Sequence, residues 1–297
     1  MFDLRYHVAS LAAVFFALVI GILVGVALAS HGLGNAERKK LQADLSAANA
    51  RVNDLTAQAK ADKVETAFAG SAYDAVMANR LRGSHVAILF VGSVDDSVRT
   101  AIEHSVSDAG GSVTRMRAIT LPVNAHAIQG ELAKHSELAA FAVGPKRFLG
   151  IGRELATEFV NGKNTSLWDA LEDQLVEERS GSGKRPVDAV VLVRTAKPQT
   201  RPASAQLVAG LFRAFADGGI PAVGVELRGT FPSAVQTYKH YNLSSVDDLD
   251  LPEGRVALAV LLSVDPPTIG HYGLQDIDDA IVPTIPPVPA LTTTTGG

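Results

Sequence analysis

Residues 85–91 read HVAILFV, an uninterrupted apolar run that ends at Gly92. A short run of this kind is typical of a strand that is buried on both faces of a parallel sheet. Asp95 or Asp96 then supplies the cap of a helix, which Gly110-Gly111 ends. The apolar residues of that helix recur every four positions, at Val98, Ile102 and Val106. A buried strand followed by a capped amphipathic helix indicates an α/β unit.

The same alternation continues to residue 264. We expect further strands at 113–119, 139–143, 187–193 and 222–227, and helices around 155–160, 167–176, 204–217 and 253–264, the last directly after Pro252. The sequence SGSG at 180–183 is interpreted as an internal linker. Strands that alternate with helices predict an α/β domain over residues 83–282, with a mostly parallel, Rossmann-like sheet.

The N-terminal part of the chain is strongly apolar. Residues 8–29 carry no charge, and as a helix they would reach about 33 Å, enough to cross the hydrocarbon of a bilayer. Ala27-Leu28-Ala29 also fits the cleavage site of a signal peptide. The apolar run is longer than signal peptides use, and only Arg5 precedes it. We therefore favour a retained transmembrane anchor over residues 1–35, ahead of a cleaved signal or a buried core helix.

Small residues recur at every fourth position of this anchor and share one helix face: Ala13, Ala17, Gly21, Gly25 and Ala29. Small side chains let two helix backbones approach closely in lipid, so the pattern predicts that the anchor self-associates. An Ala-rich chain places some small residues at this spacing by chance. Five small residues at regular spacing on one helix face favour self-association of the anchor.

Residues 36–82 contain no Pro and a single Gly, Gly70, which favours one long helix. Its apolar residues follow the 4-3-4-3-4 spacing of a left-handed coiled coil at Leu41, Leu45, Ala48, Val52, Leu55 and Ala59. The alternative is a solvated single helix, which gains little stability in water. We interpret residues 36–82 as a coiled-coil stalk, so that anchor and stalk together predict a homo-oligomer.

The composition excludes several classes of function. The chain has no Cys, which rules out disulfides, thiolate nucleophiles and Cys-ligated metal centres. Residues 83–282 hold 18 Lys and Arg against 24 Asp and Glu, a balance of −6, which argues against nucleic acid as a partner. Residues 283–297 are rich in Pro and Thr, and we expect them to be a disordered tail.

Two loops look superficially like phosphate-binding motifs. Gly92-Ser93-Val94-Asp95 has one glycine where a dinucleotide-binding turn needs three. Ser182-Gly183-Lys184 has Glu178 where a P-loop needs its leading glycine and Arg185 where it needs Ser or Thr. Neither predicts a nucleotide site. The acid pairs Asp247-Asp248 and Asp278-Asp279 are expected to be solvated on surface loops, and no catalytic residues are predicted.

Copper ligands are sparse in the sequence. No two of the eight His are spaced i, i+3 or i, i+4, and there are only three Met. The tetrapeptide Gly270-His271-Tyr272-Gly273 is the most unusual local feature, because two glycines permit tight turns on either side of a His-Tyr pair. These two side chains would either contact a ligand or partner, or fold back over the last helix, which we prefer. His271 is the one weak candidate for a metal ligand.

Several segments together resemble the mycobacterial copper transport protein B (MctB) family of actinobacteria. They are LRYHVASLAAVF at 4–15, the apolar helix with Gly21-x-x-x-Gly25, SVDDLD at 245–250, GRVAL at 254–258 and GHYG at 270–273. The likeness spans residues 2–282. No catalytic or metal-ligand residue belongs to these motifs, so copper is implied by the resemblance only.

The resemblance implies an actinobacterial envelope protein with an anchor, a coiled coil and an exported C-terminal domain. It implies a part in copper efflux or homeostasis, sometimes placed in the outer membrane, and a connection with cell separation beside a membrane partner in peptidoglycan cleavage. Arg38, Lys39 and Lys40 would favour a cytoplasmic C-terminal part, but the implied export outweighs this bias. We expect a single-pass protein of the cell membrane.

Two hypotheses follow. The first is non-enzymatic copper transport or homeostasis, which one helical anchor could support only as an oligomer or with a partner, because a single helix encloses no pore. The second is a coiled-coil envelope scaffold that works with a membrane partner in cell separation and control of peptidoglycan cleavage.

Overall fold

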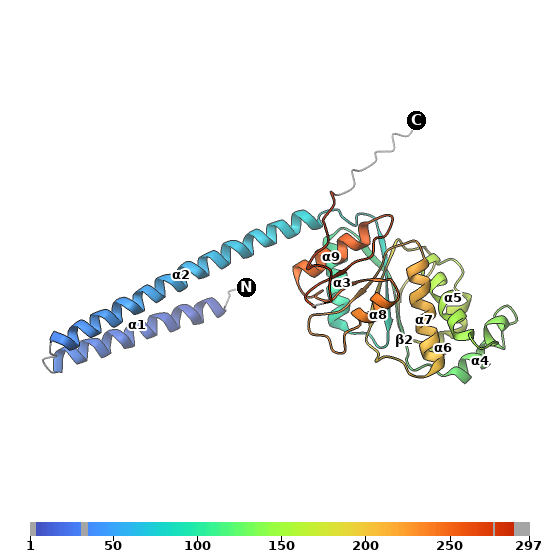
Figure 1. Cartoon of the computed structure of the whole chain (residues 1–297), viewed down its shortest axis with the longest axis horizontal. Helices are drawn as coiled ribbons and strands as arrows, with labels where there is room; N and C mark the ends of the chain where they lie inside the picture. Colours follow the sequence, from blue (N-terminus) through green and yellow to red (C-terminus); the bar gives the residue numbers. More distant parts are fainter. Residues whose placement is uncertain (1–3, 31–34, 276, 288–297) are drawn as a thin grey trace, which may run out of the picture. The chain divides into compact units, whose positions relative to one another are not determined.

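The computed structural model describes residues 4–30, 35–275 and 277–287. The chain forms two compact units, residues 1–69 and 70–297. The first unit contains α1 (Leu4–Ser30) and most of α2 (Asn35–Met77). The second contains the end of α2 and an α/β domain (Figure 1).

The helix α1 contains one candidate membrane span, Ser10–Ala27, by length and composition. None of that span is buried within the single chain. Large apolar side chains such as Leu11, Phe15 and Leu23 are exposed. A helix that shows apolar side chains on all sides fits a lipid environment better than water. The apolar N-terminal helix expected from the sequence is therefore present.

The helix α2 continues through Gly70 and ends at Met77, while residues 78–83 form turns. The predicted long helix is thus confirmed over most of its length. Its seam residues are exposed in the single chain, from 38% at Leu41 to 66% at Leu55. The side chain of Ala59 lies outside the described residues. Pairing of α2 into a coiled coil stays a prediction.

The α/β domain is built on one seven-stranded sheet in the described part of the chain, in the order β3-β2-β1-β4-β5-β6-β7. The strands are β1 (His85–Val91), β2 (Ser112–Ile119), β3 (Val176–Gly181), β4 (Ala189–Arg194), β5 (Ala222–Val225), β6 (Ser244–Val246) and β7 (His271–Tyr272). All neighbours are parallel except β2 and β3. The predicted mostly parallel sheet is confirmed.

Helices cover both faces of the sheet (Figure 1). One face packs on α3 (Asp96–Asp108) and α9 (Pro252–Ser263). The other packs on α4 (Ala125–Leu132), α5 (Arg147–Asn161), α6 (Ser166–Leu175), α7 (Pro202–Asp217) and α8 (Val235–His240). Alternate residues of β1 enter the two cores: Ile88 joins the first and Leu89 the second. This double burial explains why HVAILFV has no polar positions.

The predicted caps and most helices are confirmed. Asp95 caps α3 by accepting hydrogen bonds from the backbone N–H groups of Ser97 (2.9 Å) and Val98 (3.2 Å). Pro252 is the first residue of α9, where its missing N–H is not needed. The end of α2 belongs to the same domain, since Met77 is buried in the core with α3 and α9.

Two predictions of local structure are wrong. Residues 139–143 do not form a strand: Ala139–Ala142 is a short 3-10 helix, η1, followed by the positive-φ turn at Gly144. An Ala-rich apolar run of this length gives no intrinsic choice between strand and helix. The prediction of a linker at 180–183 is wrong for its first two residues. Ser180 and Gly181 complete the strand β3, which pairs antiparallel with β2. The side chains of β3 are mostly exposed, so its sequence carries no apolar signal.

The start of the predicted tail contacts the domain. Residues 283–287 have no helix or strand, and the buried guanidinium of Arg80 donates to the carbonyl oxygen of Pro286 at 3.2 and 3.3 Å. Residues 288–297 lie outside the described part of the chain. The division into anchor (1–35), stalk (36–82), α/β domain (83–282) and tail (283–297) stays a prediction.

Candidate functional site

The small-residue face of α1 keeps open space at its centre. A Cβ atom added at Gly21 or Gly25 would meet no atom within 4 Å in the single chain. Ala13 and Ala17 are exposed, and the side chain of Ala29 lies outside the described residues. Self-association of the anchor stays a prediction.

The crevice where ligands usually bind parallel sheets is partly filled by the chain itself, and a cavity of about 140 Å³ lined by Val91, Arg194 and Tyr241 remains there. In such sheets the site lies at the carboxyl ends of the strands where the strand order reverses, here between β1 and β4. The backbone N–H groups of Thr195 (3.2 Å) and Ala196 (2.9 Å) donate to the carbonyl oxygen of Val91. A Cβ atom at Gly92 would lie 2.5 Å from both Ala196 N and Thr195 Oγ1. The loop after β1 is thus packed against its neighbour.

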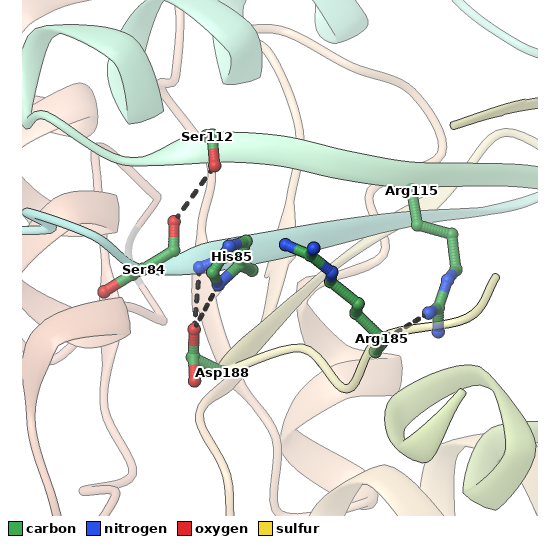
Figure 2. A network of polar contacts seen from close by, with 6 residues as sticks. All are labelled: Ser84, His85, Ser112, Arg115, Arg185 and Asp188. Atoms are coloured by element: carbon green, nitrogen blue, oxygen red, sulfur yellow. Dashed lines mark hydrogen bonds and ion pairs between the residues drawn. The ribbon is translucent and has the colours of Figure 1, made fainter. Parts of the chain in front are cut away.

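A polar network joins the amino ends of β1, β2 and β4 (Figure 2). The Oδ2 atom of Asp188 lies 2.7 Å from the backbone nitrogen of His85 and 3.2 Å from its Nδ1 atom. Ser112 Oγ donates to the carbonyl oxygen of Ser84 at 3.4 Å. Figure 2 also shows Arg115 reaching the carbonyl oxygen of Arg185. The His85–Asp188 pair is partly exposed, and these contacts hold strand ends together.

The motif Gly270–Gly273 forms the last strand of the sheet. The Nδ1 atom of His271 lies 2.9 Å from Oγ of Ser245, its partner on β6. The backbone N–H of His271 donates to Oδ2 of Asp279 at 2.9 Å, and the backbone N–H of Asp279 donates back to the carbonyl oxygen of His271 at 2.8 Å. Burial lowers the pKa of His271, and the charge of Lys239 adds to this, whereas Asp279 opposes it. His271 is a satisfied, buried side chain.

Tyr272 packs against the core cluster that contains α9, and its folding back over that helix stays a prediction. The side chain of His271 instead takes part in the Ser245 contact. Both glycines are required by close packing: a Cβ atom at Gly270 would lie 2.5 Å from the Tyr272 hydroxyl, and one at Gly273, where φ is +143°, would overlap Asp247.

Four acids gather behind this motif, at the carboxyl ends of β5 and β6 and in the segment after β7. We call Glu226, Asp247, Asp248 and Asp278 the carboxyl-edge acids. Asp247 is 3% exposed and Asp248 is 0% exposed, so the prediction that the pair 247–248 is solvated is wrong. The strand β6 ends at Val246, which places both acids where the sheet edge is covered by neighbouring segments.

Three of these acids hold backbone or amide groups. Glu226 accepts from the backbone N–H of Ala234 (2.7 Å) and from Nε2 of Gln275 (2.9 Å). Asp247 Oδ1 accepts from the backbone N–H of Leu274 at 2.8 Å. Asp278 Oδ2 accepts from the backbone N–H of Gln275 at 2.8 Å. Glu226 and Asp247 thereby fix the segment after β7 against the sheet, and Asp278 closes a turn within that segment.

Asp248 differs from the other three. Both of its carboxylate oxygens are buried and find no hydrogen-bond partner within the described residues. Burial, together with the charges of Asp247, Glu253 and Asp250, raises the pKa of Asp248 to about 7. Burial and the charge of Asp247 similarly raise the pKa of Asp278 to about 6. Burial also raises the pKa of Glu226, against the hydrogen bonds that it accepts.

The chemistry available to this cluster is therefore proton uptake near neutral pH. Over residues 4–30, 35–275 and 277–287, no group of three His, Asp or Glu side chains is arranged to hold a metal ion. Sequence reasoning missed the cluster because acids in adjacent positions look alike whether or not a neighbouring segment covers them. One feature of the sequence could have indicated this burial: Asp247 and Asp248 directly follow the short strand β6.

The comparison with protein families decides the classification. The model of the family described as "Copper transport outer membrane protein, MctB" matches residues 1–283. The chain belongs to the MctB family. The match includes α1, α2 and the whole sheet, so it covers both units, and it confirms the resemblance found in the sequence. No curated protein matches the chain.

Proposed function

We propose that this MctB family member is a membrane-anchored, non-enzymatic component of copper transport or homeostasis in the actinobacterial cell envelope. The observation that carries the proposal is the family match over residues 1–283, which spans the apolar helix α1 and the α/β domain together. Copper is treated as cargo, and α1 would hold the domain at the membrane.

The contacts of the GHYG motif support a structural role for it. His271 is engaged by Ser245 and Asp279, and Gly273 is required by the position of Asp247. We infer that the motif builds the carboxyl edge of the sheet and that copper is handled through assembly with other subunits. This fits an anchor that, as one helix, cannot enclose a pathway by itself.

The experiment is genetic. A strain lacking the gene should grow poorly on copper and recover with the full chain, but not with a chain whose anchor carries Ile20→Asp and Leu23→Asp. The matched control, Ile20→Val with Leu23→Ile, should restore growth. Unchanged copper tolerance of the deletion strain would contradict the proposal.

A second function is favoured by the exposed seam of α2. A helix of 43 residues with exposed Leu41, Leu45, Val52 and Leu55 is suited to pair with another helix. The second proposal is therefore a coiled-coil scaffold that works beside a membrane partner in cell separation and control of peptidoglycan cleavage. A cell-chaining phenotype in the deletion strain, with normal copper tolerance, would favour this function over the first.

A further inference from the structure

Arg117 on β2 is a buried cation whose guanidinium makes no hydrogen bond or ion pair in the part of the chain that the structure describes. Its side chain is 8% exposed. The Nε atom is buried, and within residues 4–30, 35–275 and 277–287 no atom of the guanidinium makes a hydrogen bond or ion pair. Arginine is rarely buried in this way unless its charge is paired. An unpaired guanidinium has five N–H groups available to an outside ligand.

The contrast with Arg115, two residues earlier on the same face of β2, is direct. Arg115 donates to the carbonyl oxygens of Phe159, Ser182 and Arg185, so each of its three guanidinium nitrogens holds a neighbouring segment. Arg117 has no comparable structural use beyond packing. Its guanidinium carbon lies 5.1 Å from the centre of the Trp168 ring.

The acids around Arg117 are committed to other groups. Glu158 accepts from the backbone N–H groups of Leu167 and Trp168 at 3.0 Å each. Glu172 pairs with Arg179 at 2.8 Å, and Asp169 accepts from Thr165 Oγ1 at 3.0 Å. The negative charges of Asp169, Glu172 and Glu158 partly offset the lowering of the Arg117 pKa that burial and Arg179 cause. They leave the donors of Arg117 free.

Trp168 and the loop 182–185 border the guanidinium of Arg117. Trp168 covers one face of the guanidinium, and Gly183 borders it elsewhere: a Cβ atom at Gly183 would lie 3.4 Å from a terminal nitrogen of Arg117. Lys184 and Arg185 follow in the same loop and are exposed. Arg179 is the register partner of Arg117 on β3. Arg179 pairs with Glu172, so Lys184 and Arg185 are the exposed cations that follow Gly183 in the loop.

We propose that Arg117 and the loop 182–185 bind a phosphate group. A guanidinium offers two parallel N–H donors that match two oxygens of a phosphate, and the exposed cations Lys184 and Arg185 in the adjoining loop favour a dianion over a carboxylate. The site differs from a nucleotide P-loop because the next element is the strand β4, so no helix begins at the loop. Lys184 and Arg185 would draw the anion toward Arg117.

Trp168 makes the test direct, because it is the only tryptophan of the chain and it lies on Arg117. The full chain in detergent is titrated with inorganic phosphate at constant ionic strength, set with chloride, while Trp168 fluorescence is recorded. We expect a saturable change for the unsubstituted chain. Arg117→Met should weaken the apparent affinity about tenfold or more, since it removes charge-assisted hydrogen bonds.

Two further variants keep the result interpretable. Gly183→Val places a branched side chain in contact with the guanidinium and should also weaken binding about tenfold, so it decides the matter if Arg117→Met does not fold. Arg213→Met, an exposed cation on α7, should leave binding within about twofold. Absence of a saturable response to phosphate would overturn the proposal, as would equal affinities in all variants. Tighter binding of acetate than of phosphate would overturn the assignment to a phosphate group.

Discussion

Asp248 lies against Gly254 in the first turn of α9, so closely that a Cβ atom at position 254 would overlap both the Oδ1 atom and the backbone oxygen of Asp248. The backbone N–H of Leu251 donates to that same oxygen at 2.8 Å. The turn between β6 and α9 is therefore built around a carboxylate that has no hydrogen-bond partner in the described part of the chain. Two predictions concern this pair.

Gly254→Ala should destabilise the α/β domain. The added methyl group has no room beside Asp248, and overpacking of this kind costs about 1–3 kcal/mol. Gly130→Ala is the matched control, because Gly130 also lies in a helix but has no atom within 4 Å of an added Cβ. The control should be neutral or slightly stabilising. Urea unfolding of the full chain in detergent, followed by Trp168 fluorescence, measures both; equal stability of the two variants would contradict the close contact.

Asp248 should make the domain less stable as pH rises. Its folded pKa of about 7 is above the ordinary value of 3.8, so the folded state binds the extra proton and stability falls between about pH 4 and pH 7. Asp248→Asn should remove about 1–3 kcal/mol of the difference in unfolding free energy between pH 5 and pH 8. Glu226 and Asp278 should leave a residual pH dependence of the same sign.

The control for this prediction is Asp217→Asn, an exposed acid at the end of α7. It should retain the full difference between the two pH values. If Asp248→Asn shows the same pH dependence of the unfolding free energy as the unsubstituted chain, then ionisation of Asp248 does not destabilise the folded state. That result would contradict its burial.

The seam residues of α2 should form the interface of the homo-oligomer. Leu45→Asp with Leu55→Asp places two charges on the proposed interface and should abolish cross-linked species, because a buried unpaired carboxylate costs several kcal/mol. Ala43→Asp with Asn53→Asp introduces acids at two positions outside the seam and should leave cross-linking intact. Chemical cross-linking of the full chain in membranes measures the outcome. Full retention of oligomers in the Leu45/Leu55 variant would exclude this seam.

The orientation of the α/β domain can be tested in cells. A β-lactamase fused after Val282 should confer resistance, because we expect the C-terminal domain to lie outside the cytoplasm. The control is the same fusion with α1 deleted, which should be expressed but sensitive. A stable, full-length fusion that leaves cells sensitive would reverse the topology.

The sequence predicted those elements whose pattern reflects their own burial. The strand β1 was found because both of its faces are buried, and α3 because Asp95 caps an apolar stripe. The strand β6, with the sequence SSV, and the strand β7, with the sequence HY, were not predicted. They are short and partly polar, and only their parallel pairing with neighbours defines them.

The same limit applies to the candidate site. Asp247 and Asp248 are buried because α9 and the segment after β7 cover the sheet edge, and that cover depends on contacts between residues distant in the sequence. Arg117 shows the opposite case: nothing in the sequence indicates that this charged residue of an expected strand is buried without a hydrogen bond or ion pair in the described part of the chain. The family, by contrast, was identified from local motifs at both ends of the chain.

The central claim is that the chain takes part in copper handling at the envelope, and the direct measurement is cell-associated copper. Deletion and complemented strains are exposed to copper, and metal content is measured by mass spectrometry with zinc as the reference metal. We expect copper, and not zinc, to be higher in the deletion strain and to return to the normal level with the full chain. Equal copper contents in the two strains would contradict it.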